Sequence, residues 1–214
     1  VGSEFLINTH LSDQQIDPSI TGLSDGGFVV TWSSNLQDGN GYGIYGQRFD
    51  SAGTSVGYEF LVNTETNLDQ QASATTGLSG GGFVVTWRSD WQDGSSSGVY
   101  GKIYNSDGTS DGDEFRINST VEASQEESSV APLENGGFVV TWTDRSNSSS
   151  EPFSGVYGQI YDSEGSQQGG ELHINTQTDG FQEQSCVTGL SNGGFIVVWS
   201  SSHDADGDGK GIFG

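Results

Sequence analysis

A short apolar run recurs four times along the chain and predicts buried β-strands. The first copy reads Phe28-Val-Val-Thr-Trp32, and in an extended strand its alternate side chains point to opposite faces. Both sets of side chains suit burial, which is typical of a strand covered on both sides. No segment keeps a 3.6-residue apolar period, so the pattern predicts no helix.

The four apolar runs belong to a longer internal repeat. Their first residues, Phe28, Phe83, Phe138 and Phe195, are separated by 55, 55 and 57 positions. A tryptophan follows each phenylalanine by four positions, and a glutamine, an asparagine and a glutamate precede it at fixed distances. The tryptophans are Trp32, Trp87, Trp142 and Trp199. Agreement at several fixed offsets in four copies establishes the repeat, and we expect these tryptophans to pack in the core.

Each unit predicts four short antiparallel strands, which in the first unit cover 18–23, 28–32, 44–49 and 59–62. Asp25-Gly26 between the first two is a pair that accepts positive φ in a tight hairpin. Four-stranded units repeating at this length favour an all-β, four-repeat, β-propeller-like domain with four-stranded antiparallel blades. A pair of β-sandwiches and an open β-solenoid are the alternatives.

The repeat predicts one domain over 1–214, with units at 9–63, 64–118, 119–175 and 176–214. The chain begins at Val1-Gly2, which matches Val56-Gly57 in a fourth strand. We therefore expect residues 1–8 to complete the last unit and close a ring. The same strand pairing with another molecule would give a filament or swapped oligomer, and a fragment of a longer array is the third alternative.

The charge of the chain excludes several partners. Its 29 acidic and 6 basic residues give a net charge of −23 over 214 residues. Nucleic acid and anionic membranes require basic side chains, so neither is expected as a partner. No apolar run approaches the length that spans a bilayer, which argues against membrane insertion. The single cysteine, Cys186, excludes an internal disulfide and a cysteine-based zinc site.

Several segments resemble repeats of very large secreted bacterial proteins that often carry haemolysin-type calcium-binding or adhesin modules. They are Gly26-Gly-Phe-Val-Val-Thr-Trp32, Gln37-Asp-Gly39, Gly43-Ile-Tyr-Gly-Gln-Arg-Phe-Asp50 and Glu59-Phe-Leu-Val-Asn-Thr64. The resemblance spans essentially the whole chain. It implies an extracellular protein, secreted or at the cell surface, that is associated with calcium and has an adhesive role. The third copy departs from the pattern, because Asn147-Ser-Ser-Ser150 replaces Gln-Asp-Gly.

The last unit carries the strongest candidate cation site. Asp204, Asp206 and Asp208 occupy positions 1, 3 and 5 of an Asp-x-Asp-x-Asp-Gly loop, whose carboxylates can surround Ca²⁺. The acid of position 12 is missing, because that position lies beyond Gly214, so weak affinity of about 10⁻⁴ to 10⁻³ M is expected. The alternative is a solvated acidic loop.

The equivalent loops of the first two units hold further candidate calcium ligands, Asp38 in the first and Asp90 and Asp93 in the second. The alternative is a glycine-assisted turn in which the aspartate caps its own backbone.

Aromatic residues in these loops suggest sugar binding. Tyr42, Trp91 and Phe153 stand in three of the four loops, which a repeat would place on one rim. Exposed rings among amides and carboxylates suit stacking on sugar faces. The alternative is that each ring covers its own loop.

Catalytic residues are harder to identify, because a catalytic pair arises from asymmetry and not from a residue that every unit shares. The recurring Glu4, Glu59, Glu114 and Glu171 are therefore expected to be structural. An enzyme requires a pocket with two carboxylates of unequal pKa. We predict a secreted, non-enzymatic, calcium-supported structural or adhesive module that assembles with itself. Its alternatives are a lectin that binds extracellular glycans and, third, a glycan-active enzyme.

Overall fold

The computed structural model describes residues 2–146, 152–203 and 209–214. These residues form antiparallel β-sheets, one for each sequence repeat. None of them belongs to a helix that could cross a bilayer. The prediction of an all-β, propeller-like domain with four-stranded blades is therefore confirmed, and in the fourth blade the described residues form three strands.

Each blade follows the chain order of its strands. The first contains β1 (Gln15–Gly22), β2 (Phe28–Asn35), β3 (Tyr42–Phe49) and β4 (Ser55–Leu61). The second contains β5 (Gln70–Gly77), β6 (Phe83–Asp90), β7 (Ser97–Tyr104) and β8 (Phe115–Arg116). The third contains β9 (Gln125–Pro132), β10 (Phe138–Asp144), β11 (Gly155–Tyr161) and β12 (Gln167–His173). The fourth contains β13 (Gln182–Gly189), β14 (Phe195–Ser201) and β15 (Gly211–Phe213).

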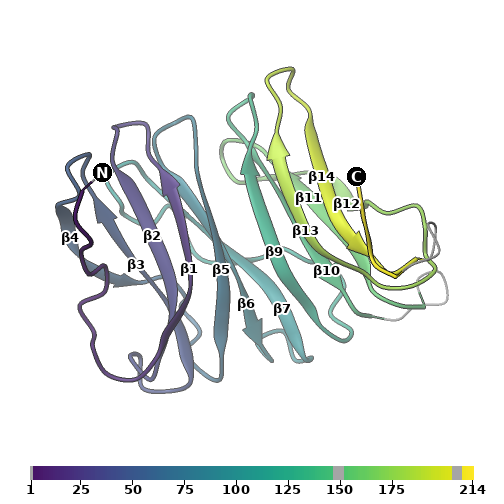
Figure 1. Ribbon diagram of the computed structural model, residues 1–214, viewed down its shortest axis with the longest axis horizontal. Helices are drawn as coiled ribbons and strands as arrows, with labels where there is room; N and C mark the ends of the chain where they lie inside the picture. Colours follow the sequence, from purple (N-terminus) through teal and green to yellow (C-terminus); the bar gives the residue numbers. More distant parts are fainter. Residues whose placement is uncertain (1, 147–151, 204–208) are drawn as a thin grey trace.

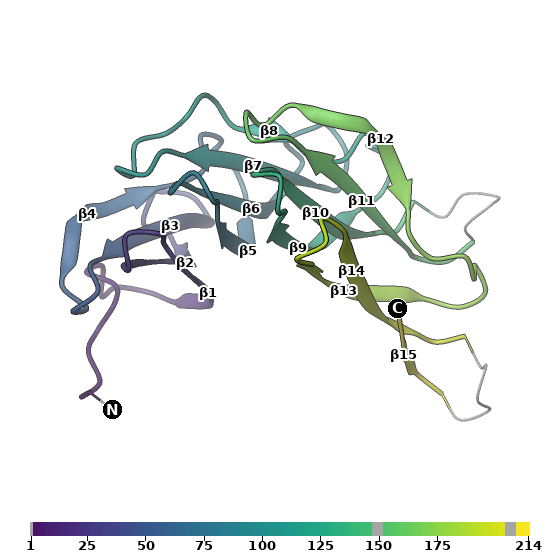
Figure 2. The same cartoon turned by 90° about the horizontal axis from the view of Figure 1, so that it is seen from above.

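The blades stand side by side along an open arc (Figures 1 and 2). The first strand of each blade, β1, β5, β9 or β13, lies on the concave side of the arc. Strands β4, β8 and β12 lie on the convex side, as Figure 2 shows. The inner strands therefore form one continuous concave surface.

The two glycines before each apolar run have different structural roles. Gly81 adopts a φ of 93°, which the tight turn between β5 and β6 requires. Gly82 passes so close to β7 that a Cβ there would lie 2.1 Å from the carbonyl oxygen of Tyr104. The pair thus sets the turn and lets the second strand approach the third.

Blades pack face to face through their second strands. One core joins Val29 and Ile44 of the first blade to Phe83, Val85 and Trp87 of the second. An equivalent core joins the second blade to the third and includes Trp142, which is fully buried like Trp87. Both faces of the apolar run are thus covered. Trp32 is also buried. A third core joins the third blade to the fourth, and Trp199 is partly buried against it, which confirms the predicted packing role of the tryptophans.

The recurring polar residues fasten neighbouring strands and blades. The Asn63 side chain accepts a hydrogen bond from the Ile44 N–H (2.7 Å) and donates one to Gln70 (3.2 Å). Glu114 accepts a hydrogen bond from the backbone N–H of Thr64 (2.5 Å). Glu59 and Glu171 accept equivalent bonds, which agrees with the structural role predicted for these three of the four shared glutamates; for Glu4 the role stays a prediction.

The four blades do not close a ring. Residues 2–8 lie along the outer face of the first blade, where Phe5 meets the Phe49 ring edge-on at 5.8 Å. The described ends of the chain are at opposite ends of the arc (Figure 2), so residues 2–8 do not complete the fourth unit of their own chain. The reason is the small turn from blade to blade, which brings four blades only part of the way round a circle.

Replacing Trp87 by alanine is expected to lower the free energy of unfolding by about 3–5 kcal/mol, because it empties a fully buried site between two blades. Chemical denaturation measures the change. Trp91→Ala is the matched control, since that ring is 61% exposed and its loss should change stability little. Equal destabilisation by the two substitutions would contradict the packing described here.

Candidate functional site

Every inner strand carries the same backbone distortion near its first residues. Asp17, Ala72, Glu127 and Gln184 have φ angles of 51°, 55°, 56° and 57°. Pairing of each inner strand with its neighbour shifts register at this point, as in a β-bulge. A positive φ at a residue other than glycine costs about 1–3 kcal/mol and is often found at functional sites. The bulge lies at the same end of each blade as the loops that carry Trp91 and Phe153.

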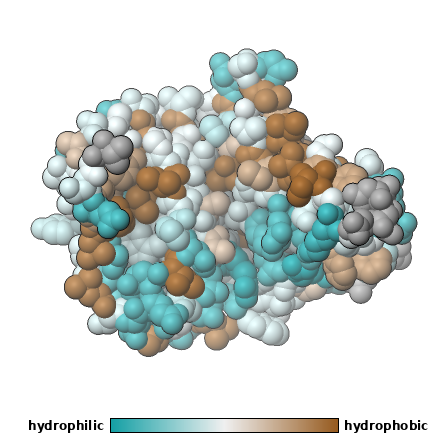
Figure 3. Space-filling view, in the orientation of Figure 1, coloured by the Kyte–Doolittle hydropathy of each residue, from teal (hydrophilic) through white to brown (hydrophobic). Residues whose placement is uncertain are grey.

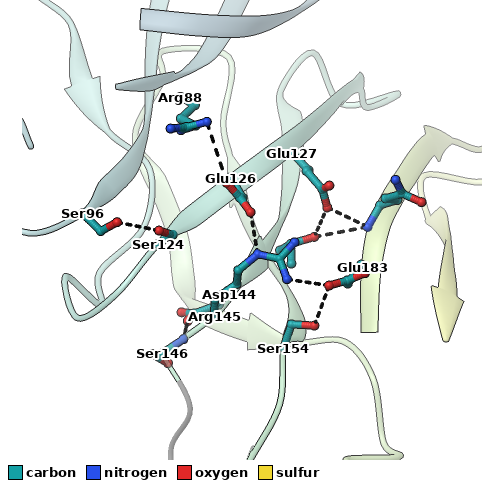
Figure 4. Close-up of polar contacts among 12 residues, drawn as sticks. Arg88, Ser96, Ser124, Glu126, Glu127, Asp144, Arg145, Ser146, Ser154 and Glu183 are labelled. Carbon is teal, nitrogen blue, oxygen red and sulfur yellow. Dashed lines mark hydrogen bonds and ion pairs between the residues drawn. The ribbon is translucent and has the colours of Figure 1, made fainter. Parts of the chain in front are cut away.

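A cluster of charged side chains surrounds the bulges of β9 and β13 (Figure 4). Arg145, which follows β10, lies at its centre. Its Nε donates to Glu126 Oε1 on β9 (2.5 Å), and its guanidinium NH1 donates to Glu183 Oε1 on β13 (2.5 Å). One guanidinium thus joins the third and fourth blades. We call Glu126, Glu127, Arg145 and Glu183 the Arg145 cluster.

Two further cations flank the Arg145 cluster. Lys210 Nζ lies 3.3 Å from Glu183 Oε2. On the other side Arg88 bonds Asp90 (2.8 Å) and lies 4.0 Å from Glu126. Three of the six basic residues of the chain therefore gather at this place.

The contacts shift the pKa values of two members in opposite directions. Burial disfavours the charged form of Arg145, but its hydrogen bonds to Glu126 and Glu183 outweigh burial and raise its pKa. Burial also acts to raise the pKa of Glu183, but hydrogen bonds from Arg145 and Lys210 hold that pKa below its ordinary value. Glu183 is thus kept as a carboxylate.

Glu127 has a different environment from Glu183. Its Oε2 accepts hydrogen bonds from the Thr143 hydroxyl (2.9 Å) and from the backbone N–H of Gln184 (3.1 Å). Among the described residues no cation forms an ion pair with it. Two carboxylates on adjacent inner strands, Glu127 on β9 and Glu183 on β13, therefore differ in what stabilises their charge.

An apolar pocket adjoins the Arg145 cluster. It has a volume of 340 Å³ and is lined by Arg145, Pro152, Phe153, Ser154 and Phe181. The Phe153 and Phe181 rings meet edge-on at 5.2 Å and are partly exposed. The Ser154 hydroxyl lies 3.4 Å from Glu183 Oε1, which links the pocket to the carboxylates. A flat apolar ring beside polar groups is a suitable surface for a sugar.

The structure brings only one of the predicted sugar-binding aromatics to this pocket, and that is Phe153. Tyr42 donates from its hydroxyl to Gln14 Oε1 (2.7 Å) and so belongs to the first blade. Trp91 is exposed on the second blade, where its φ of 58° marks a tight loop. The three residues do lie at the same end of their blades, as the repeat predicts.

The predicted calcium ligands do not assemble into one group. Asp90 forms an ion pair with Arg88, so its carboxylate already has a cationic partner, and its role as a calcium ligand stays a prediction. Asp38 and Asp93 each accept a backbone N–H with one oxygen, at 3.1 Å, as an aspartate that caps its own turn does. Within the described ranges no three His, Cys, Asp or Glu residues are placed to hold a metal. The last predicted set lies outside the described residues and comprises Asp204, Asp206 and Asp208.

A capped turn accounts for only one of the two carboxylate oxygens of Asp38 and of Asp93. The second carboxylate oxygen of each aspartate is buried and has no hydrogen-bond partner among the described residues. The side-chain oxygens of Gln37 and Gln92 are likewise buried and have no hydrogen-bond partner among the described residues.

Tyr45 lies close enough to Asp38 for the two to interact. Burial, followed by the negative charges of Asp38 and Glu59, raises the pKa of the Tyr45 hydroxyl to about 12.

The Arg145 cluster escaped sequence reasoning because its members break the repeat. Arg145 stands where the first two units have Asn35 and Asp90, and Glu127 stands where the others have Asp17, Ala72 and Gln184. The sequence feature that could have indicated this site is the scarcity of basic residues, because three of the six Lys and Arg residues lie here. Phe181 also stands outside the repeated pattern and was missed.

No protein-family model matches the chain, and a search of curated proteins finds no similar sequence. Solved structures share its fold. The α-L-arabinanase of Penicillium chrysogenum, complexed with arabinobiose, has a TM-score of 0.64 at 16% identity, over 95% of this chain and 62% of that chain. The GH93 α-L-arabinofuranosidase of Fusarium graminearum, also with arabinobiose, has a TM-score of 0.67 at 13% identity, over 93% and 60%. The endo-arabinase of Bacteroides thetaiotaomicron has 0.57 at 11%, over 98% and 78%.

These comparisons contradict the prediction of a non-enzymatic, calcium-supported structural or adhesive module. All three structural neighbours are named for enzymes that act on glycans, which also contradicts the prediction that the protein is not an enzyme. The chain spans between 60% and 78% of the length of those proteins. At 11–16% identity the likeness shows the fold alone, so activity is a matter for proposal.

Glu183→Gln is expected to lower stability at pH 7 by about 1.5–3 kcal/mol, because it removes charged hydrogen bonds from Arg145. The pKa of Glu183 is lowered on folding, so its contribution is full above the unfolded pKa of about 4.3 and is lost as pH falls through the folded value. Denaturation of both proteins from pH 7 down to pH 3 measures this. Their difference should shrink with falling pH; a constant difference would count against the ion pair.

Proposed function

We propose that the protein is a glycan-active enzyme that binds and hydrolyses a neutral polysaccharide at the Arg145 cluster. The observation that carries the proposal is the pair of unequal carboxylates on adjacent inner strands, Glu127 and Glu183, beside the Phe153 pocket. Glycoside hydrolysis requires one carboxyl group that delivers a proton and one that stays ionised. The shared fold with arabinan-degrading enzymes supports the same class of reaction.

The two carboxylates suit different roles. Glu183, held ionised by Arg145 and Lys210, is the candidate nucleophile or base. Glu127, which has only neutral donors, is the candidate acid that protonates the leaving oxygen. Arg145 fixes the position of Glu183, and the rings of Phe153 and Phe181 offer a face on which a sugar can stack.

The charge of the chain limits the substrate class. With a net charge of −23, the protein repels acidic glycans at long range. A neutral glycan escapes this repulsion and can be held by hydrogen bonds from Arg145 and Ser154. An extracellular location is part of the proposal, as is membership of a secreted bacterial repeat family, because the segments quoted in the sequence analysis resemble such repeats.

The direct test is the release of reducing sugar from a panel of neutral polysaccharides, arabinan among them. Glu127→Gln and Glu183→Gln should each lower the rate by about 10²-fold or more, because each removes a carboxyl group from the reaction. Glu164→Gln is the matched control, since Glu164 is exposed in the β11–β12 turn at the other end of its blade. Undiminished activity in Glu127→Gln would reject its role as the acid.

A glycan-binding module without hydrolysis is the second candidate. It is favoured by the ion pairs that neutralise Glu126 and Glu183, since these pairs also orient Arg145 as a hydrogen-bond donor. Binding that is lost in Phe153→Ala, together with no sugar release by the unaltered protein, would identify this function. Release of sugar would exclude it.

We also propose that the Asp38 and Asp93 loops bind Ca²⁺. The support is the buried, unpartnered oxygens of Asp38 and Asp93 and of the preceding glutamines, since Ca²⁺ prefers oxygen ligands. Added Ca²⁺ should raise the melting temperature, and EDTA should reverse the rise. In Asp38→Asn plus Asp93→Asn the Ca²⁺-dependent rise should be reduced, whereas Asp111→Asn, an exposed control, should keep it. An equal Ca²⁺ response in both variants would contradict these sites.

A further inference from the structure

Backbone strain is concentrated at one end of the blades. In the described part of the chain nine residues other than glycine have a positive φ, and all of them lie at the end where the inner strands begin. At the opposite end the turns place glycine at positive φ, as Gly26 and Gly81 do. Glycine adopts this conformation without cost, so strain that is kept at one end indicates a functional surface there. We call this end of the blades the strained rim.

Three of the strained residues are large, apolar and exposed. Leu36, Leu68 and Trp91 have φ angles of 59°, 61° and 58° and are 51%, 48% and 61% exposed. A bulky residue at positive φ is an outlier, and contact with water does not favour an apolar side chain. A ligand that covers these side chains would offset both costs.

Hydrogen bonds join the loops that carry these residues. Asp69, which follows Leu68, accepts the N–H of Tyr42 on its side chain (3.0 Å) and the N–H of Asp90 on its backbone oxygen (2.9 Å). Tyr42 ends the loop of the first blade, and Asp90 directly precedes Trp91. Exposed apolar side chains therefore follow the strained rim from the first blade to the second.

The connection continues from Trp91 to the Arg145 cluster. The Trp91 N–H donates to the backbone oxygen of Ser96 (2.8 Å), and the hydroxyl groups of Ser96 and Ser124 bond each other at 2.7 Å. The backbone oxygen of Ser124 accepts the N–H of Arg145 (2.9 Å). Figure 4 shows the Ser96–Ser124 contact beside Arg145. The loop of Trp91 is thus fixed to the segment that carries Arg145.

Ion pairs cover the same part of the rim. Asp90, beside Trp91, pairs with Arg88 at 2.8 Å, and Arg88 lies 4.0 Å from Glu126, which pairs with Arg145. Each carboxylate in this row has a cation beside it. Between Trp91 and the Phe153 pocket the rim therefore presents fixed hydrogen-bonding groups with little net charge, which suits the hydroxyl groups of a neutral ligand.

Exposed aromatic rings stand at both ends of this charge-balanced segment. Trp91 belongs to the second blade, and the Phe153 and Phe181 rings precede β11 of the third blade and β13 of the fourth. Packed sheets lie about 10 Å apart, so a path from the second blade to the fourth is on the order of 20 Å long. A chain of several sugar rings spans that length, whereas a disaccharide does not.

The distribution of apolar surface favours a sugar chain over a protein partner. Figure 3 shows hydrophobic patches that are set apart from one another among hydrophilic surface on the side where the inner strands begin. A protein interface has a continuous apolar centre. A sugar chain instead presents apolar ring faces and hydroxyl groups in alternation, as the strained rim does.

We propose that the strained rim binds one long, linear, neutral glycan that lies on Trp91 and on the Phe153 and Phe181 rings at once. The inference rests on the proposed function and names its substrate class, because a chain held in this way has its interior at Glu127 and Glu183 and is cut there. In that step the glycosidic C–O bond breaks, water supplies a hydroxyl group to the sugar carbon, and the departing oxygen takes a proton.

Affinity as a function of chain length tests the path without requiring hydrolysis. Linear arabinan, galactan and β-glucan, each beside its disaccharide, are titrated into Glu127→Gln by calorimetry, and the ratio of polymer affinity to disaccharide affinity is taken. Trp91→Ala in the same background should lower this ratio about 3- to 10-fold, the range for the loss of one aromatic contact. Trp91→Phe, which keeps a ring, should restore most of it.

Leu190→Ala is the matched control for Trp91→Ala. Leu190 is an apolar side chain, 40% exposed in the β13–β14 turn at the opposite end of the blades, so its loss should leave the ratio unchanged. An unchanged ratio in Trp91→Ala, or no binding of any of the three polysaccharides, would overturn the path along the rim.

The products separate this inference from the proposed function. Chromatography of an early digest by the unaltered protein should show oligosaccharides of mixed length, because the chain is cut in its interior. Release of single sugars alone would overturn interior cleavage and leave hydrolysis at Glu127 and Glu183 standing. No released sugar, together with a ratio that depends on Trp91, would reject the hydrolysis and support the glycan path.

Discussion

Burial of both faces of the second strand in the first three blades is the constraint on which this fold depends. Val29 and Thr31 point to one side and Val30 and Trp32 to the other, and all are buried. One blade supplies cover for one face only, so each blade is stable because of its neighbours, as in other repeat proteins.

The regular positions of the repeat serve packing, and the irregular positions form the Arg145 cluster. Asparagine, glutamine and glutamate recur because each blade needs the same bonds to its neighbour. The β-bulge with a positive φ also recurs, at the same position of every inner strand. Only on β9 and β13 do the residues around that bulge differ enough to form the Arg145 cluster. A symmetric scaffold thus holds a site that exists because the symmetry is broken.

Sequence patterns predicted the strands, the blades, the buried tryptophans and the common rim of loops, because each depends on local alternation or on a fixed offset. They did not predict the open arc. The rotation between blades depends on how side chains such as Ile44 and Phe83 fit across the contact, and no periodicity encodes that angle. The Arg145 cluster was also beyond reach, since Arg145 and Glu183 lie 38 positions apart and meet only because two blades are neighbours.

Charge explains why the Arg145 cluster differs from the rest of the surface. In a chain with 29 acidic and 6 basic residues, most carboxylates have no basic partner. At this site Arg88, Arg145 and Lys210 meet Asp90, Glu126 and Glu183, so the local charge is close to balanced. Glu127 is the extra carboxylate, and it is held by neutral donors alone. A nearly balanced, partly buried region presents fixed hydrogen-bond donors and acceptors, which is why the glycan proposal is placed here and not at the acidic loops.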